Sequence, residues 1–182
     1  MTMRLIILAG LPGVGKSHTA RVLQTRLGAY YFDSDRFAKT YAENTDMDIT
    51  SLEGAALAEK RLEGHRAKIE EILRLFDEHE TILLDTCFDM VESRTLFYAL
   101  EKRGIELVIV ELTCSEAIVH ERIFGSTHES DRMVGTAQSR WDFYRQMKSH
   151  WIPIEHVDHV IVTDADYDVQ IERLVRTLEE TR

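Results

Sequence analysis

Residues 10–17 read Gly-Leu-Pro-Gly-Val-Gly-Lys-Ser and complete the pattern G-x-x-x-x-G-K-[ST]. An apolar run at 5–9 precedes the pattern and a helix-like stretch follows it, which is the context of a phosphate-binding loop. Glycines let the backbone wrap closely around a phosphate, and a helix amino terminus turns its free N–H groups inward. We expect Lys16 to reach the β- and γ-phosphate oxygens and the Ser17 hydroxyl to ligate Mg²⁺. The pattern therefore predicts binding of a nucleotide together with magnesium.

Acidic residues follow two predicted strands, 29–32 and 81–85. Ligands of an open parallel sheet bind beyond the carboxyl ends of its strands, so we expect Asp33, Asp35 and Asp85 to lie beside the phosphate loop. Asp35 could accept the proton of an attacking hydroxyl, and Asp85 could orient the Mg²⁺ shell through water. A turn or a helix cap is the alternative for Asp33 and Asp35, because Asp-Ser-Asp suits both.

Residues 120–132 form a polar, glycine-containing stretch between two predicted helices, as an active-site lid requires. Arg122 and Arg132 could neutralise the charge on a transferred phosphoryl group and exclude water, and we place the lid at about residues 122–135. A surface salt bridge with neighbouring glutamates is the alternative for Arg122.

Other residues are candidates for the base and the acceptor. The loop that follows the last predicted strand contains Asp164 and is expected beside the purine, where Arg122 could also stack. The expected nucleotide contacts are Gly10, Leu11, Pro12, Gly13, Val14, Gly15, Lys16, Ser17, His18, Arg122 and Asp164. The expected acceptor contacts are Asp33, Asp35, Arg36, Lys39 and Asp89, with solvation of a loop as the alternative for Asp89.

Strand-like and helix-like segments alternate along the chain, which predicts an α/β fold with a parallel sheet covered on both faces. The predicted strands are 4–9, 29–32, 81–85, 105–112 and 159–163. The predicted helices are 16–27, about 51–78, 91–103, 115–124, 133–150 and 166–180. We expect one domain over residues 1–182.

Composition limits the class of protein. The chain has 182 residues, of which 44% are hydrophobic and 30% charged, as in globular domains. Apolar runs stay well below the ~20 residues of a membrane span, and the start of the sequence lacks the pattern of a secretory leader. Cys87 and Cys114 are expected to be reduced thiols of a cytoplasmic protein. The net charge of −10 argues against tight binding to duplex nucleic acid, and the oligomeric state cannot be read from the sequence.

Taken together, the motifs resemble those of small P-loop kinases of the zeta-toxin-like and polynucleotide-kinase-like type, often labelled AAA-family ATPases. The resemblance rests on residues 10–17, Ser34-Asp35, 83–86 and the segment 114–131 with Arg122 and Ser130-Asp131. It implies a three-layer α/β/α P-loop NTPase fold with a five-stranded sheet in the order 2-3-1-4-5 and a helical lid. It also implies Mg²⁺-ATP as the donor, a hydroxyl group as the acceptor, and Asp35 as the residue that activates this hydroxyl.

The family often has an arginine three residues after this Asp, where it grips an acceptor phosphate, but here the position is Ala38. The favoured function is therefore phosphorylation of a small metabolite or a nucleoside-like acceptor. A polynucleotide 5′-end kinase or repair component is the first alternative, and a nucleotide-dependent regulatory or toxin-like ATPase is the second.

Overall fold

One parallel sheet organises the protein. The computed structural model describes residues 3–45, 54–125 and 136–181, and in these residues five strands are ordered β2-β3-β1-β4-β5. The strands are β1 (Met3–Ala9), β2 (Tyr30–Asp33), β3 (Thr81–Thr86), β4 (Ile105–Thr113) and β5 (His159–Val162). This result confirms the α/β class, the parallel sheet and the expected strand order.

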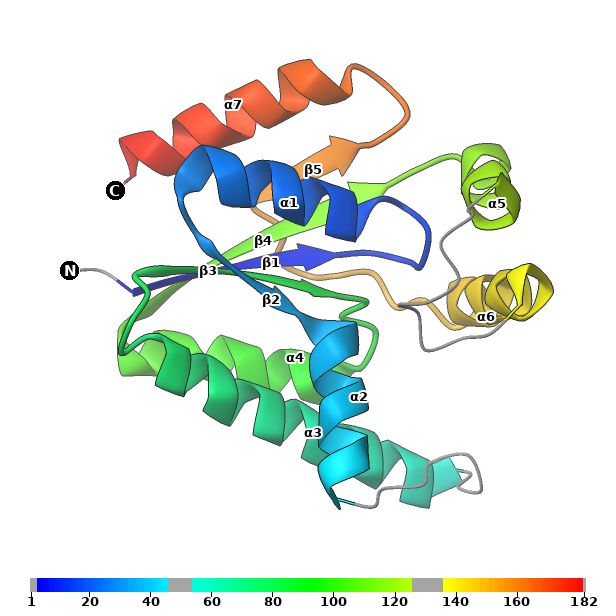
Figure 1. Cartoon of the computed structure of the whole chain (residues 1–182), viewed down its shortest axis with the longest axis horizontal. Coiled ribbons are helices and arrows are strands. Elements are labelled where there is room, and N and C mark those ends of the chain that lie inside the picture. The colour runs from blue at the N-terminus through cyan, green and yellow to red at the C-terminus, as the bar shows by residue number, and fades with distance from the viewer. Residues whose placement is uncertain (1–2, 46–53, 126–135, 182) are drawn as a thin grey trace.

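Helices cover both faces of the sheet (Figure 1). They are α1 (Lys16–Leu27), α2 (Ser34–Thr45), α3 (Gly54–Leu75), α4 (Val91–Tyr98), α5 (Glu116–Gly125), α6 (Ala137–Ser149), α7 (Tyr167–Glu180) and the 3₁₀ helix η1 (Ala99–Arg103). In Figure 1, α1 and α7 lie above the sheet and α3 and α4 lie below it, whereas α5 and α6 stand beyond the carboxyl ends of the strands. Among the described helices, none combines the length and hydropathy that a membrane span requires.

The central strand shows why the sheet needs two covers. Leu5 and Ile7 belong to the apolar core between the sheet and helices α3 and α4. Ile6 and Leu8 belong to the core between the sheet and helices α1 and α7. All four side chains are fully buried. A parallel strand that is buried on both faces reads as a continuous apolar run, which is the pattern found at 5–9.

The helix α2 is the main difference from the predicted elements. Its residues were expected to form loop and acceptor pocket, but they form three helical turns directly after β2. Only Ser34 of α2 is buried, and the apolar face of the helix is a short, half-buried stripe that includes the stacked rings of Phe37 and Tyr41. The Asp33 carboxylate accepts a hydrogen bond from the Arg36 amide at 3.0 Å and thereby caps the first turn.

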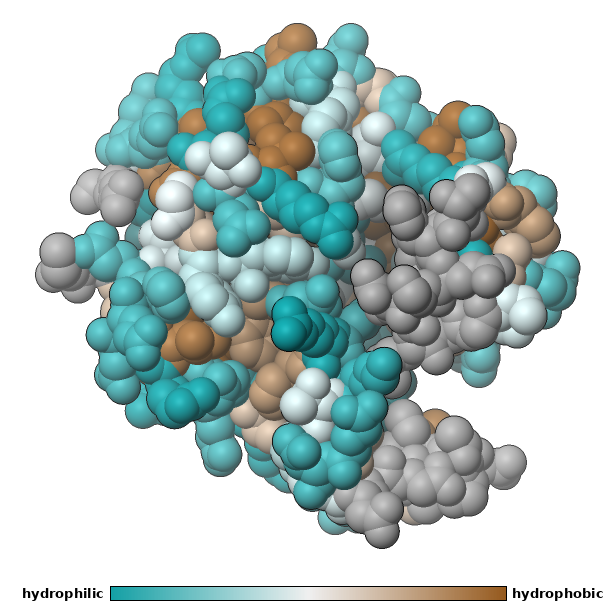
Figure 2. Space-filling view, viewed as in Figure 1, coloured by the Kyte–Doolittle hydropathy of each residue, from teal (hydrophilic) through white to brown (hydrophobic). Residues whose placement is uncertain are grey.

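Other boundaries differ by smaller amounts. The predicted helix 91–103 is divided into α4 and η1, and the long predicted helix ends at Leu75. The first residues of the predicted helices 51–78 and 133–150 lie outside the described residues, as does most of the predicted lid. The face shown in Figure 2 is mainly hydrophilic, with small separate apolar patches.

Candidate active site

The phosphate loop joins β1 to α1 and depends on close approach. A Cβ atom on Gly10, whose φ is 144°, would lie 2.4 Å from the carbonyl oxygen of Leu112 in β4. A Cβ atom on Gly13 would lie 2.9 Å from a methyl group of Val119 in α5. These two positions therefore require glycine, because both the backbone conformation and the space exclude a side chain. The Lys16 ammonium donates hydrogen bonds of 2.9 Å to the carbonyls of Gly10 and Leu11, so it lies across the loop.

Asp85 lies directly beside the loop. Its Oδ2 atom accepts hydrogen bonds from the Ser17 hydroxyl at 2.7 Å and from the Tyr31 hydroxyl at 3.0 Å. Asp85 is 7% exposed. In the parallel pairing of β2 with β3 its backbone lies opposite that of Asp33. Burial, followed by the charge of Asp85, raises the pKa of Tyr31, so the phenol stays protonated and donates. A serine hydroxyl and a carboxylate are the oxygen donors that Mg²⁺ prefers, so the pair fits the expected magnesium site.

Asp35 occupies the first turn of α2, close to Asp85 and Lys16. Its side chain keeps access to solvent, yet partial desolvation and then the nearby charge of Asp85 raise its pKa. Lys16 and Lys68 act in the opposite direction, because their positive charges favour the carboxylate. The structure thus brings Asp35, Lys16 and Asp85 into one electrostatic neighbourhood.

Residues of α3 contact the start of α2 and the loop after β3, and none of them was named individually from the sequence. Lys68 is 6% exposed and donates a short hydrogen bond to the Ser34 hydroxyl. Burial lowers its pKa to about 8, although Asp35 and Asp85 partly offset this effect. Arg61, also on α3, forms a 2.7 Å ion pair with Asp89, so Asp89 lies beside this helix.

His65 lies between Arg61 and Lys68 on the same face of α3. Its Nδ1 atom is buried and makes no hydrogen bond to the residues that the structure describes, while its ring meets the edge of Phe97. Burial and the cations Lys68 and Arg61 lower the pKa of His65 to about 4. A sequence signal existed, because residues 61, 65 and 68 recur at helical spacing, but polar residues at such spacing usually mark a solvated face.

Arg122 supports the phosphate loop from the nucleotide side. Its guanidinium donates to the Val14 carbonyl at 3.1 Å, to the Thr163 hydroxyl at 2.9 Å and to the Thr163 carbonyl at 3.1 Å. These contacts replace the surface ion pair that was the alternative interpretation. Asp164 accepts a hydrogen bond from the Ser115 amide at 2.9 Å, and the His18 ring lies 5.7 Å from that of Tyr167.

Other predicted residues are less engaged. Arg36 and Lys39 are exposed on α2, and Arg132 lies outside the described residues. No cluster of three or more metal-ligating side chains occurs in the described part of the chain, and a magnesium ion held by phosphates needs none. Burial raises the pKa of Cys87, which disfavours a thiolate nucleophile there.

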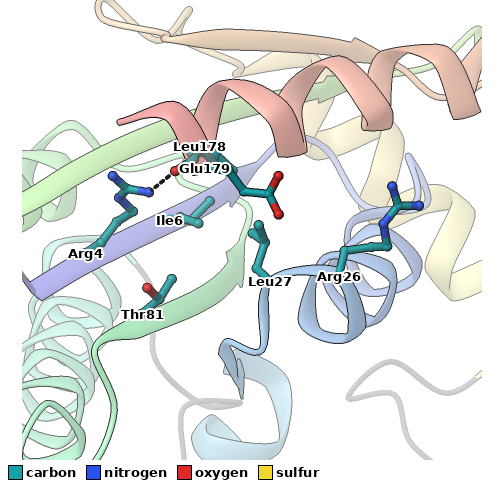
Figure 3. A pocket seen from close by; sticks show the side chains of 7 residues that line it. All are labelled: Arg4, Ile6, Arg26, Leu27, Thr81, Leu178 and Glu179. Atoms are coloured by element: carbon teal, nitrogen blue, oxygen red, sulfur yellow. Dashed lines mark hydrogen bonds between the residues drawn. The ribbon is translucent and has the colours of Figure 1, made fainter. Parts of the chain in front are cut away.

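A separate hollow lies at the opposite, amino edge of the sheet, away from Ser17 and Asp85. Figure 3 shows side chains from β1, β3, α1 and α7 around it, with the hydrogen bond from Arg4 to the Leu178 carbonyl at one side. Its lining residues are Arg4, Ile6, Arg26, Leu27, Thr81, Leu178 and Glu179. Arg4 and Arg26 there bind groups of α7, and none of the lining residues is one of the candidate site residues. This hollow is therefore separate from the candidate active site.

Known proteins share this architecture. A family profile described as an AAA domain matches residues 5–148. No curated protein matches the sequence.

Three solved kinases show the same fold. The APS kinase of Mycobacterium tuberculosis, in complex with AMPPNP and APS, superposes with a TM-score of 0.66 at 18% identity, covering 98% of both chains. A gluconokinase from Sinorhizobium meliloti has a TM-score of 0.63 at 15% identity and covers 99% of this chain and 97% of its own. A shikimate kinase from Bacteroides thetaiotaomicron has a TM-score of 0.55 at 13% identity and covers 100% of this chain and 98% of its own.

Proposed function

This chain belongs to the AAA domain family, and we propose that it is a kinase that transfers the γ-phosphoryl group of Mg²⁺-ATP to a hydroxyl group of a small metabolite or nucleoside-like acceptor. The observation that carries the proposal is the 2.7 Å hydrogen bond between Ser17 and Asp85, with Asp35 close to Asp85. The solved kinases with this fold include proteins named for gluconate, shikimate and APS, which makes a small acceptor the first class to test.

Each residue has a role in this reaction. Amides of residues 10–17 and the Lys16 ammonium bind the phosphate tail, and Arg122 holds the loop in place. Ser17 and Asp85, joined by a hydrogen bond of 2.7 Å, would hold the magnesium ion, Ser17 by its hydroxyl and Asp85 through water. Mg²⁺ supplies neutralisation of charge on the phosphate oxygens when it is bound.

Asp35 acts at the acceptor. Its carboxylate accepts the proton of the acceptor hydroxyl while that oxygen forms a bond to the γ-phosphorus and the bond from the γ-phosphorus to the bridging oxygen breaks. The electron pair of that bond leaves with ADP. Positioning and electrostatic stabilisation supply most of the acceleration in such a reaction. Arg132 remains the predicted lid residue that closes over the transferred group.

A panel of acceptors tests the proposal. The protein is incubated with γ-labelled ATP and Mg²⁺ together with sugar acids, shikimate, APS, nucleosides or 5′-hydroxyl oligonucleotides. We expect label in one small acceptor and stimulation of ATP turnover by that acceptor. Label only in the oligonucleotide would indicate an end kinase, and ATP hydrolysis that no acceptor stimulates would indicate a regulatory ATPase. Both results contradict the proposal.

Substitution of Asp35 provides the first prediction. Asp35→Asn keeps the size of the side chain but removes the proton acceptor, so we expect ATP affinity close to that of the wild type and transfer reduced by ~10²-fold or more. Fluorescent-nucleotide displacement and label transfer measure the two quantities. Asp142→Asn, on the exposed face of α6, is the matched control. Undiminished transfer by Asp35→Asn would refute the role of Asp35.

A further inference from the structure

The start of α2 is joined to α3 by a buried cation. Lys68 is only 6% exposed, and its ammonium donates to the hydroxyl of Ser34, the residue directly before Asp35. A buried ammonium is costly unless it is paired with acceptors or negative charge. The hydrogen bond to Ser34 and the nearby carboxylates of Asp35 and Asp85 meet this requirement.

In the part of the chain that the structure describes, the charges that act on Asp35 come from four elements. Asp85 on β3 and Asp33 on β2 disfavour its carboxylate, whereas Lys16 on α1 and Lys68 on α3 favour it. Lys16 is committed to the phosphate loop through Gly10 and Leu11. Among the described residues, Lys68 adds its positive charge to that of Lys16 and favours the Asp35 carboxylate, and unlike Lys16 it also contacts the start of α2 through Ser34.

We propose that Lys68 is a positioning residue for Asp35: its buried ammonium fixes the first turn of α2 through Ser34 and keeps the Asp35 carboxylate charged. This role rests on the proposed kinase function, since it explains how Asp35 remains able to accept a proton between two other acids. The same contact couples helix α3 to the reacting group.

A carboxylate titration tests the inference without any acceptor. The protein is labelled with ¹³C at aspartate carboxyl carbons, and the Asp35 signal is identified by its loss in Asp35→Asn. Removal of the cation in Lys68→Met should raise the pKa of Asp35 by about one unit, the effect expected when a nearby opposite charge is lost. Lys68→Arg keeps the charge and should leave this pKa close to the wild-type value.

Two further variants make the test decisive. Lys60→Met changes a partly exposed lysine on the same helix, paired with Glu63, and should not move the titration of Asp35. Lys68→Gln keeps a donor for Ser34 and serves if Lys68→Met does not fold. An unchanged Asp35 titration in a folded, uncharged Lys68 variant would overturn the inference, whatever the acceptor panel shows. A failed acceptor panel with a shifted titration would instead contradict only the kinase function.

Once an acceptor is identified, the pH profile supplies a second readout. The acid limb of kcat should move to higher pH in Lys68→Met by about the same one unit, while KM for ATP stays near the wild-type value. A loss of rate at all pH values without movement of the limb would indicate a purely structural role and would contradict the inference.

Discussion

Asp85 accepts hydrogen bonds from side chains of two different elements. Ser17 belongs to the phosphate-binding helix, whereas Tyr31 belongs to the neighbouring strand. The G-K-[ST] spacing and an acid at the end of a buried strand predicted that Ser17 and Asp85 lie beside the same loop, but not the hydrogen bond between them. Tyr31 escaped prediction because an aromatic residue in a strand is usually core, and only the register of β2 with β3 brings its hydroxyl to the carboxylate.

Lys68 and His65 show the limit of prediction at the residue scale. A sequence does not reveal whether a polar residue on a helix faces solvent or a neighbouring helix, because this depends on how α3 packs beside α2 and α4. The expected acceptor contacts Arg36 and Lys39 remain predictions, and they lie exposed on α2.

The buried His65 predicts a pH dependence of stability. Its pKa is about 4 in the folded protein, compared with 6.5 for an ordinary histidine, so the unfolded chain binds more protons between these values. Stability is therefore lost as the pH falls from 6.5 towards 4. Between pH 7 and pH 5 we expect the free energy of unfolding of the wild type to fall by about 2 kcal/mol more than that of His65→Phe.

Urea unfolding at the two pH values measures this difference. His150→Phe, which alters an exposed histidine, should behave as the wild type does. Equal acid sensitivity of His65→Phe and the wild type would show that His65 protonates freely in the folded state.

At the scale of elements, the phosphate loop is enclosed by its neighbours. Gly10 approaches β4, Gly13 approaches α5, and Arg122 of α5 donates to the Val14 carbonyl. The glycine pattern predicted the loop from local sequence alone. The helix α2 was missed because most of its residues are exposed, although a helix cap had been named as the alternative role of Asp33, which caps its first turn.

The contact between Gly10 and β4 predicts a large effect of a single methyl group. Gly10→Ala would place a Cβ atom 2.4 Å from the Leu112 oxygen, so we expect a loss of about 2–4 kcal/mol in the free energy of unfolding and weaker nucleotide binding.

Gly104→Ala is the matched control, because Gly104 also has a positive φ of 77° but its Cβ atom would meet no described atom within 4 Å. It should cost only about 1 kcal/mol of backbone strain. Thermal and urea unfolding compare the two variants, and equal losses would argue against the steric explanation.

At the scale of the whole molecule, the alternation of segments predicted the parallel sheet, whereas its strand order followed only from the family resemblance. Long-range contacts that close the fold had no local signal. Arg4 in β1 is 6% exposed, donates to the carbonyls of Leu178 and Thr181 at 2.5 and 2.8 Å, and pairs with Glu106 in β4 at 2.8 Å. It thus fastens the last turn of α7 to the central strands, which a sequence cannot show across so long a separation.

These contacts of Arg4 predict a variant that is less stable but still binds nucleotide. Arg4→Met leaves buried carbonyls without their donor, so we expect the free energy of unfolding to fall by about 2–3 kcal/mol while affinity for Mg²⁺-ATP stays unchanged. Arg26→Met removes an exposed ion pair with Glu172 and should cost less than about 1 kcal/mol. Chemical unfolding and nucleotide titration separate the two effects. A fall in nucleotide affinity with Arg4→Met would contradict this prediction and would show that contacts at the amino edge of the sheet affect the phosphate loop.

The position of these Arg4 contacts, beside both ends of the described chain, has a practical consequence. Met3 and Thr181 both lie at the edge of the sheet that faces away from Ser17 and Asp85, as the chain ends in Figure 1 show. An affinity tag, a fluorescent fusion partner or a tether to a sensor chip can therefore be attached at either end without covering the candidate active site.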